Sequence, residues 1–356
     1  MKKYYRSIYF TETPLKKKYR YKDIFQIIPI DSKIAPKCPY ALHFPLYLEY
    51  FIELPEEDFK SINSDVIDEL AIRSSIERGF LELLTCFSNH SFIKYENVNF
   101  WGIISPAIKF EELDEKANKL YNNQYSSWVI GSYIYPGLYN ELQINNLTET
   151  EIEDVIKIPY YEYFTNDPLE DINREITFPD TLDICIENYF NLKVDYQNKV
   201  KSAIRLINNG LSISKTMRSI AFLSYVSSIE TMVSIEMDDE TIEFCKACKT
   251  LKKSIHTCNV CGSPIWGVRK KFAEYLKKYV AGSISSQRKY KKIYDLRSKI
   301  AHNGHLFLSD IDNTFDDMVI KNKEWLMNLE TLQLARLNIV NWIRDPENKA
   351  NRQQGV

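Results

Sequence analysis

Apolar residues recur every three or four positions through most of the second half of the chain. This period places them on one face of an α-helix, so it predicts helices that bury one side against their neighbours. The first helix is expected to stop at Asn209-Gly210, because such a pair favours the left-handed backbone that ends a helix. The predicted helices lie near 181–208, 216–236, 267–280, 285–303 and 312–343. Five helices with no convincing strand between them predict an all-α bundle.

The first half has the pattern of a mixed α/β domain. Short stretches rich in β-branched and aromatic residues predict strands, and apolar residues at helical spacing predict a helix near 65–88. The strand-like stretches are SIYF, FQIIPI, LYLEYFIEL, FIKYENVNFWGII and WVIGSYIY. The acidic, proline-bearing segment 166–180 has no clear period and marks a domain boundary. We therefore expect an α+β protein, with a mixed α/β domain over 1–170 and a helical bundle over 176–350.

Length and composition agree with two folded domains. The 356 residues exceed one compact core of ordinary size, and 44% hydrophobic with 26% charged residues argues against long disorder. The basic N-terminus has no apolar run behind it, and no stretch reaches the ~18 apolar residues of a membrane span. These observations predict a cytoplasmic protein that does not enter a membrane.

Charge separates the two halves of the chain. Residues 1–175 carry a net charge of −9 and residues 176–356 a net charge of +7. Within 246–299, fifteen Lys and Arg residues face only Glu274 and Asp295. Such a stretch is either a solvated helical surface or a surface for the phosphates of a nucleic acid. The candidate nucleic-acid-binding residues are Lys252, Lys253, Arg269, Lys270, Lys271, Arg288, Lys289 and Lys292.

Four of the seven cysteines form two C-x-x-C pairs. Cys245, Cys248, Cys258 and Cys261 have the spacing C-x2-C-x9-C-x2-C, in which each pair offers two thiolates to one tetrahedral Zn²⁺ ion. Four sulfur ligands leave no position for water, so the predicted zinc is structural rather than catalytic. We expect a small zinc knuckle over 243–265, inserted between the second and third helices.

An arginine interrupts the apolar stripe of the fourth predicted helix, which is expected to begin at a Ser285 or Ser286 cap. Arg297 lies in the middle of this stripe, where a guanidinium is costly unless an anion meets it. The anion is either an internal carboxylate, such as Glu230 on the second helix, or a phosphate held by the planar guanidinium. The stripe consists of Tyr290, Ile293, Tyr294, Ile300 and Ala301.

A histidine follows the arginine by five positions. On a straight helix His302 would lie about 140° around the axis from Arg297, so the two side chains would not share a face. Asn303-Gly304 is a left-handed cap signal, and a histidine at the helix end can turn back toward the arginine. The alternative is that His302 only complements the helix dipole at a C-terminus.

The segment IYDLRSKIAHNGH, together with the preceding helix AFLSYVSSIETMVS, resembles the HEPN superfamily and in particular its Apea-like branch. The resemblance covers about residues 181–345 and leaves the first half unmatched. It implies a helical bundle with an R-x4-6-H motif. Arg297 and His302 match the two motif positions, and Tyr294 and Glu230 match flanking polar positions.

The resemblance implies a metal-independent endoribonuclease that acts as a homodimer, with two motifs brought into one cleft. His302 would accept the proton of a 2′-OH, and Arg297 would stabilise the charge on the phosphate. The expected products are a 2′,3′-cyclic phosphate and a 5′-hydroxyl. Ser298, where many members have Asn, Asp or His, and Asn303, which precedes the glycine, would orient the phosphate or the imidazole; His305 is an alternative base.

The resemblance also implies a biological setting and leaves two rival functions open. Related bacterial proteins act in antiphage defence, as toxins or in abortive infection, so the first half would sense a phage or host trigger. The main rival is a non-catalytic protein that binds RNA or a nucleotide, or scaffolds a complex, with Arg297 in a salt bridge and His302 as a cap. A regulator that binds DNA through the zinc knuckle is a third possibility.

Overall fold

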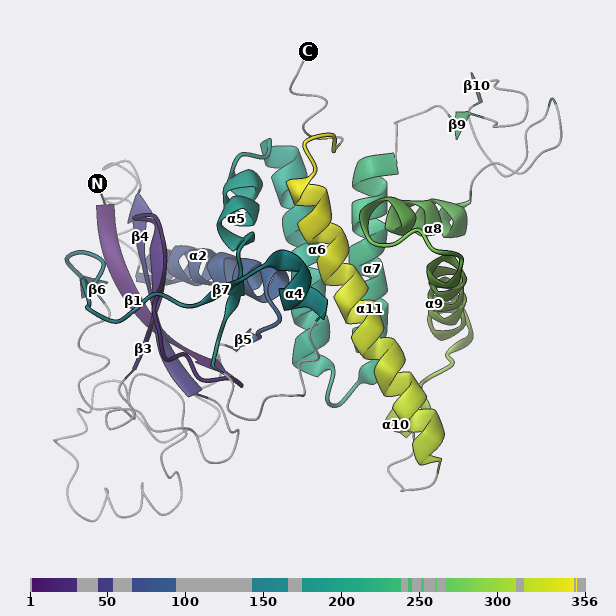
Figure 1. Ribbon diagram of the computed structural model, residues 1–356, viewed down its shortest axis with the longest axis horizontal. Coiled ribbons are helices and arrows are strands. Elements are labelled where there is room, and N and C mark those ends of the chain that lie inside the picture. The colour runs from purple at the N-terminus through teal and green to yellow at the C-terminus, as the bar shows by residue number, and fades with distance from the viewer. Residues whose placement is uncertain are drawn as a thin grey trace. The chain divides into compact units, whose positions relative to one another are not determined.

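The computed structural model divides into two compact units, Met1–Asp183 and Ile184–Val356 (Figure 1). It describes residues 2–30, 44–53, 66–93, 143–165, 175–237, 243–244, 251–252, 260, 267–311, 317–348 and 350. The division lies a few residues after the predicted boundary, because strand β8 (Phe178–Pro179) pairs in parallel with β7 (Lys157–Ile158) in the first unit. The predicted order, a mixed α/β half followed by a mostly helical half, is confirmed.

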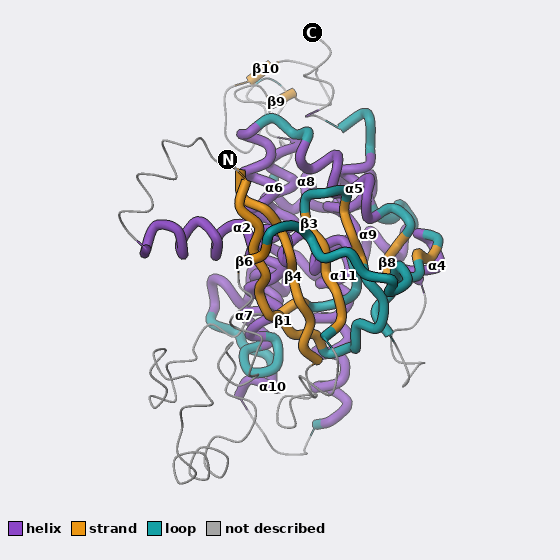
Figure 2. The backbone as a smooth tube through the Cα atoms, turned by 90° about the vertical axis from the view of Figure 1, so that its left-hand side faces the viewer, coloured by secondary structure: helices purple, strands orange, loops and turns teal. Residues whose placement is uncertain are grey.

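The first unit is built on an antiparallel sheet (Figure 2). The strand order is β2-β3-β4-β1-β5, and β6 also pairs with β1. These strands are β1 (Lys2–Thr11), β2 (Tyr19–Tyr21), β3 (Phe25–Pro29), β4 (Phe44–Glu53), β5 (Phe92–Ile93) and β6 (Gln143–Ile144). The stretches SIYF, FQIIPI and LYLEYFIEL are thus confirmed as strands, FIKYENVNFWGII is described only at β5, and WVIGSYIY lies outside the described residues.

Helix α2 (Val66–Phe87) confirms the helix predicted near 65–88 and packs on this sheet. Its Phe80 stacks on Phe25 of β3 with ring centroids 4.5 Å apart. Its buried Glu77 accepts hydrogen bonds from the hydroxyls of Tyr9 (2.7 Å) and Tyr50 (2.6 Å). Burial first, and then the Glu77 charge, raises the pKa of both tyrosines, so both phenols stay protonated and keep donating.

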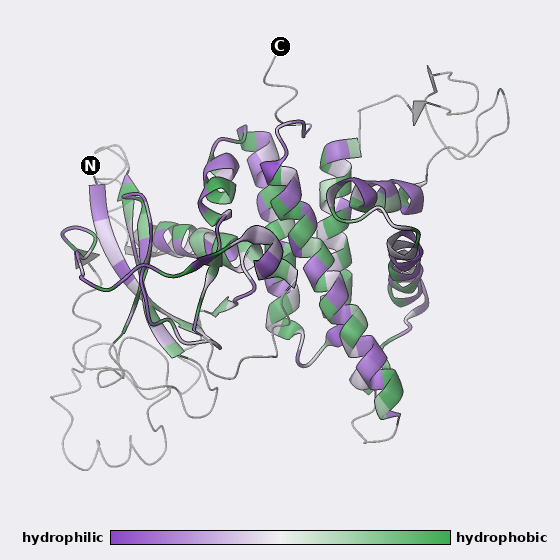
Figure 3. Cartoon of the chain, viewed as in Figure 1, coloured by the Kyte–Doolittle hydropathy of each residue, from purple (hydrophilic) through white to green (hydrophobic). Residues whose placement is uncertain are grey.

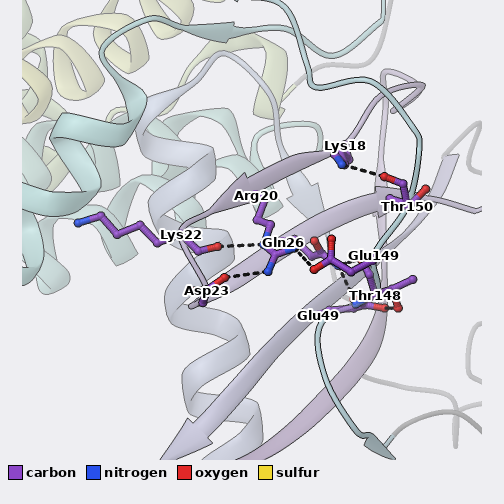
Figure 4. Close-up of polar contacts among 9 residues, drawn as sticks. All are labelled: Lys18, Arg20, Lys22, Asp23, Gln26, Glu49, Thr148, Glu149 and Thr150. Atoms are coloured by element: carbon purple, nitrogen blue, oxygen red, sulfur yellow. Dashed lines mark hydrogen bonds and ion pairs between the residues drawn. The ribbon is translucent and has the colours of Figure 1, made fainter.

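A buried carboxylate also joins three neighbouring strands. Arg6, Glu49 and Gln26 lie opposite one another on β1, β4 and β3. Glu49 receives Arg6 Nε at 2.8 Å, Gln26 Nε2 at 2.6 Å and the backbone N–H of Thr148 at 2.8 Å. The segment after β6 is thereby tied to the sheet, with further contacts from Lys18 to Thr150 and from Arg20 to Glu149 (Figure 4). A short helix, α4 (Tyr160–Thr165), follows in the same unit.

The second unit is a bundle arranged around one central helix. Helix α7 packs against α6, α8, α9 and α11. The division between the units falls inside α5 (Leu182–Phe190), which belongs to the second unit from Ile184 onward. The other helices of this unit are α6 (Val194–Ile213), α7 (Arg218–Met237), α8 (Val268–Tyr279), α9 (Ile284–Asn303), α10 (Leu308–Ile311) and α11 (Met318–Arg344). Along the chain, α7 is followed by the antiparallel strands β9 (Glu243–Phe244) and β10 (Leu251–Lys252), and then by α8.

Several predicted helix ends are wrong. The helix predicted from 181 breaks between α5 and α6, and Asn209-Gly210 does not end α6, which runs on to Ile213. A Cβ on Gly210 would lie 2.4 Å from the Tyr225 ring, so this glycine permits the close approach of α6 to α7. The cap of α9 is Ser283 rather than Ser285 or Ser286. The last predicted helix, near 312–343, is described as α11 from Met318 to Arg344, and the short α10 that precedes it was not predicted.

Within the described residues, α7 is the one helix that is long and apolar enough to cross a membrane by length and composition. Its buried side chains include Phe222, Val226, Ile229 and Met232, which contact the surrounding helices of the bundle. A central helix of a helical bundle has this composition because several neighbouring helices pack against it. The packing of α7 is therefore that of a core helix.

We expect Gly210→Ala to destabilise the helical unit by about 1–3 kcal/mol, because the new methyl group collides with the Tyr225 ring. Gly79→Ala on α2 is the matched control, since a Cβ there meets nothing within 4 Å and alanine favours a helix by about 0.5–1 kcal/mol. Thermal unfolding of both variants checks the pair. Equal stability of the two variants would contradict the close approach of α6 to α7.

Candidate functional site

The arginine and the histidine meet at the C-terminal end of α9. Arg297 Nη1 lies 3.4 Å from His302 Nε2, although the two positions differ by about 140° around the helix. The long guanidinium arm spans this difference. Helix α9 ends as predicted, with Gly304 in the left-handed conformation (φ 65°) and its N–H bonded to the carbonyl oxygen of Lys299.

This contact restricts the state of the imidazole. A guanidinium only donates hydrogen bonds, so His302 Nε2 can take part in this one only as the acceptor. A separation of 3.4 Å is at the long limit for such a bond. The exposed imidazole can therefore exchange Arg297 for a substrate hydroxyl. A neutral histidine with an accessible Nε2 lone pair is the state that a general base needs.

A carboxylate from α7 meets the arginine on its other side. Arg297 Nη2 lies 3.2 Å from Glu230 Oε2, and the two side chains are only 24% and 19% exposed. The predicted internal partner of Arg297 is thus present. Tyr294 lies beside the pair, with its ring centroid 5.9 Å from Arg297 Cζ. Burial first, and then the Glu230 charge, raises the pKa of Tyr294, so its phenol stays protonated.

The stripe on α9 is narrower than the sequence predicts. Tyr290, Ile293 and Ile300 are buried, and Tyr294 and Arg297 are half-buried at its border. Ala301 is exposed, so the prediction that it belongs to the apolar stripe is wrong. Of the two other candidate residues at the motif, Ser298 is half-buried and Asn303 is exposed. The geometry therefore gathers Arg297, His302, Tyr294 and Glu230.

The chain that follows His302 is fastened to the start of α7. Asp310 accepts the backbone N–H groups of Arg218 (2.8 Å) and Ser219 (2.7 Å), the first residues of α7. The Ser219 hydroxyl in turn accepts the N–H of Phe307 at 2.7 Å. On α11, Glu324 accepts the N–H groups at the start of α10. No local sequence signal predicts these contacts, because their partners are up to 92 residues apart.

A basic stripe leads along α9 to the histidine. Arg288, Lys292, Lys299 and His302 are exposed at positions i, i+4, i+11 and i+14, which share one face of the helix. Hydrophilic residues dominate both α8 and α9 (Figure 3). Among the other predicted nucleic-acid-binding residues, Lys270 is exposed, Lys271 is half-buried, Arg269 pairs with Asp295, and Lys289 pairs with Glu330. Such exposed pairs are weak and open readily to a phosphate.

The predicted zinc ligands Cys245, Cys248, Cys258 and Cys261, and the basic residue Lys253, lie outside the described residues. Lys252 lies on β10, and the first cysteine pair falls between β9 and β10 in the sequence. In the part of the chain that the structure describes, no cluster of three or more His, Cys, Asp or Glu side chains is arranged to hold a metal.

Comparison of the chain with protein-family models, curated proteins and solved structures finds no match. The geometry of Arg297, His302, Tyr294 and Glu230 at the end of α9 is therefore the feature of the described residues that bears on function.

We expect Asp310→Ala to destabilise the helical unit by about 1–2 kcal/mol, because two N–H groups at the start of α7 lose their acceptor. Asp317→Asn is the control: Asp317 precedes α11 in a left-handed conformation (φ 59°) that asparagine tolerates, and its side chain makes no capping hydrogen bond. Thermal unfolding compares the two variants. If Asp310→Ala loses no more stability than Asp317→Asn, the chain after His302 is not fastened to α7 through Asp310.

Proposed function

We propose that the protein is a metal-independent endoribonuclease of the HEPN type. The observation that carries this proposal is the approach of Arg297 Nη1 to His302 Nε2 at an exposed helix end. A cation that binds phosphate and a neutral imidazole that accepts a proton are the two groups that cleavage of RNA through its 2′-OH requires. The resemblance of IYDLRSKIAHNGH to the R-x4-6-H motif supports the same reaction.

The proposed reaction uses the ribose of the substrate as the nucleophile. His302 accepts the proton of the 2′-OH, and the 2′-oxygen attacks the adjacent phosphorus. The bond from phosphorus to the 5′-oxygen breaks, and that oxygen takes up a proton. Arg297 stabilises the charge on the phosphoryl oxygens. The products are a 2′,3′-cyclic phosphate and a 5′-hydroxyl, and DNA is not a substrate because it lacks the 2′-OH.

The basic stripe on α9 supports RNA as the partner. Arg288, Lys292 and Lys299 lie on the same face of α9 as His302, so a strand held by its phosphates along them reaches the imidazole. The proposal includes a homodimer, which in the resembling family brings two motifs together. It also includes a cytoplasmic role in antiphage defence or as a toxin, with the first unit sensing a phage or host trigger.

Zinc has a structural part in this proposal. By their spacing, the four thiolates of Cys245, Cys248, Cys258 and Cys261 would complete a tetrahedral set around one Zn²⁺ ion and leave no coordination site for a catalytic water. The ion would stabilise the segment between α7 and α8 and would take no part in the reaction. The cleavage step then belongs to side chains alone.

One observation favours a second function, a non-catalytic protein that binds RNA or a nucleotide or scaffolds a complex. Glu230 already supplies an anion to Arg297 at 3.2 Å, which is the arrangement that a structural arginine would have. In that case the basic stripe binds phosphates and His302 only ends α9. Binding would weaken steeply with salt, and no strand would be cut.

The test is incubation of the protein with tRNA and with a structured single-stranded RNA in the presence of EDTA, followed by mapping of the ends. We expect cyclic phosphate ends from the wild type and a loss of about 100-fold or more in rate for both His302→Ala and Arg297→Ala, because each removes a group that acts in the transition state. His305→Ala is the matched control and should keep its activity.

Circular dichroism and zinc content identify variants whose fold has changed. The wild type could bind RNA without cutting it, both at full length and after removal of residues 1–175. That result would overturn the nuclease function in favour of the non-catalytic RNA-binding protein. If His305→Ala loses activity while His302→Ala stays active, the general base is His305 rather than His302.

A further inference from the structure

Glu230 is the acidic side chain at the candidate site, and the proposed reaction gives it no task. A carboxylate beside a phosphate-binding arginine opposes the arrival of a phosphate, so its presence needs a physical reason. Both side chains are largely removed from solvent, and they come from different helices, α7 and α9.

We infer that Glu230 is a positioning residue that orients the guanidinium of Arg297 toward His302, an inference that rests on the proposed nuclease function. The two terminal nitrogens of Arg297 are engaged differently. Nη2 is held by Glu230 at 3.2 Å, whereas Nη1 is directed to His302 at 3.4 Å. Because a guanidinium is planar, fixing one terminal nitrogen fixes the direction of the other.

Tyr294 lies beside this pair. Its ring centroid is 5.9 Å from Arg297 Cζ, and burial first, and then the Glu230 charge, raises the pKa of its phenol. The Tyr294 ring packs on Phe272 of α8 with ring centroids 5.3 Å apart, which limits its motion. The arrangement therefore runs from Glu230 through Arg297 to His302, and the Tyr294 ring packs beside Arg297.

The arrangement has opposite effects on binding and on catalysis. The Glu230 charge repels an approaching phosphate, so it weakens ground-state binding of RNA. The same charge holds Arg297 where the negative charge develops in the transition state, and misplacement of such a group by about 1 Å costs on the order of 100-fold in rate. Loss of Glu230 should therefore strengthen RNA binding and slow cleavage.

Glu230→Gln tests this split in the full-length protein. We expect cleavage at saturating RNA to slow by about 10–100-fold, while the Kd for a 2′-deoxy analogue that cannot be cleaved stays unchanged or falls by a few fold. Glu274→Gln on α8 removes an acidic charge that pairs with Lys277 and not with Arg297, and it should change neither quantity.

Side-chain NMR of Arg297 gives a readout that needs no RNA. In the wild type its guanidinium signals should be distinct, because Glu230 holds one nitrogen; in Glu230→Gln they should merge as the group rotates freely. The Arg297→Lys spectrum assigns these signals. If the wild type cuts no RNA but its Arg297 signals still depend on Glu230, the proposed nuclease function is wrong. The inference that Glu230 orients Arg297 would then still hold.

Two outcomes would overturn the inference. Faster cleavage together with tighter binding in Glu230→Gln would make Glu230 a competitor of the phosphate rather than a positioning residue. Distinct Arg297 signals that persist in Glu230→Gln would show that the orientation comes from elsewhere. Thermal unfolding accompanies each variant, so that a loss of cleavage caused by unfolding is recognised.

Discussion

The half-buried cation of Arg297 is the constraint on which the rest of the helical unit depends. A guanidinium that loses most of its water must meet an anion, and Glu230 on α7 supplies it at 3.2 Å. This pairing fixes how α9 lies along α7, because the two side chains must arrive at the same level. Any rotation of α9 that buried an apolar residue in place of Arg297 would also carry His302 away. A residue that looks misplaced in its helix thus sets the geometry of the candidate site.

Helix α7 is the common support for everything that meets at this site. It carries Glu230, its first turn is capped by Asp310, and its Ser219 holds Phe307 in the chain just after His302. On another face Tyr225 packs against Gly210 of α6. The apolar composition of α7 follows from this central position, since α6, α8, α9 and α11 all pack against it. A support of this kind keeps Arg297 and His302 in place at the candidate site.

Local signals in the sequence predict much of this structure, and long-range contacts account for the rest. Helical periodicity locates α2, α7, α8 and α9, and the pair Asn303-Gly304 marks the end of α9. The same kind of pair at Asn209-Gly210 misleads, because Gly210 serves close packing against a ring 15 positions away. Arg297 is predicted because it interrupts the apolar stripe on α9. Glu230 is predicted because a buried guanidinium needs an anionic partner. The backbone contacts of Asp310 and Glu324 have no local pattern, so only the fold reveals them.

In the proposed function, the end of α9 acts on an RNA phosphodiester through the neighbouring 2′-OH. The most direct test uses an RNA with a single 2′-deoxynucleotide immediately 5′ to a mapped cleavage site. We expect cleavage at this position to disappear while other positions are cut and binding is unchanged, because only the nucleophile is missing. Cleavage at the deoxy position at the same rate would overturn the proposed reaction, since another nucleophile would then attack the phosphate.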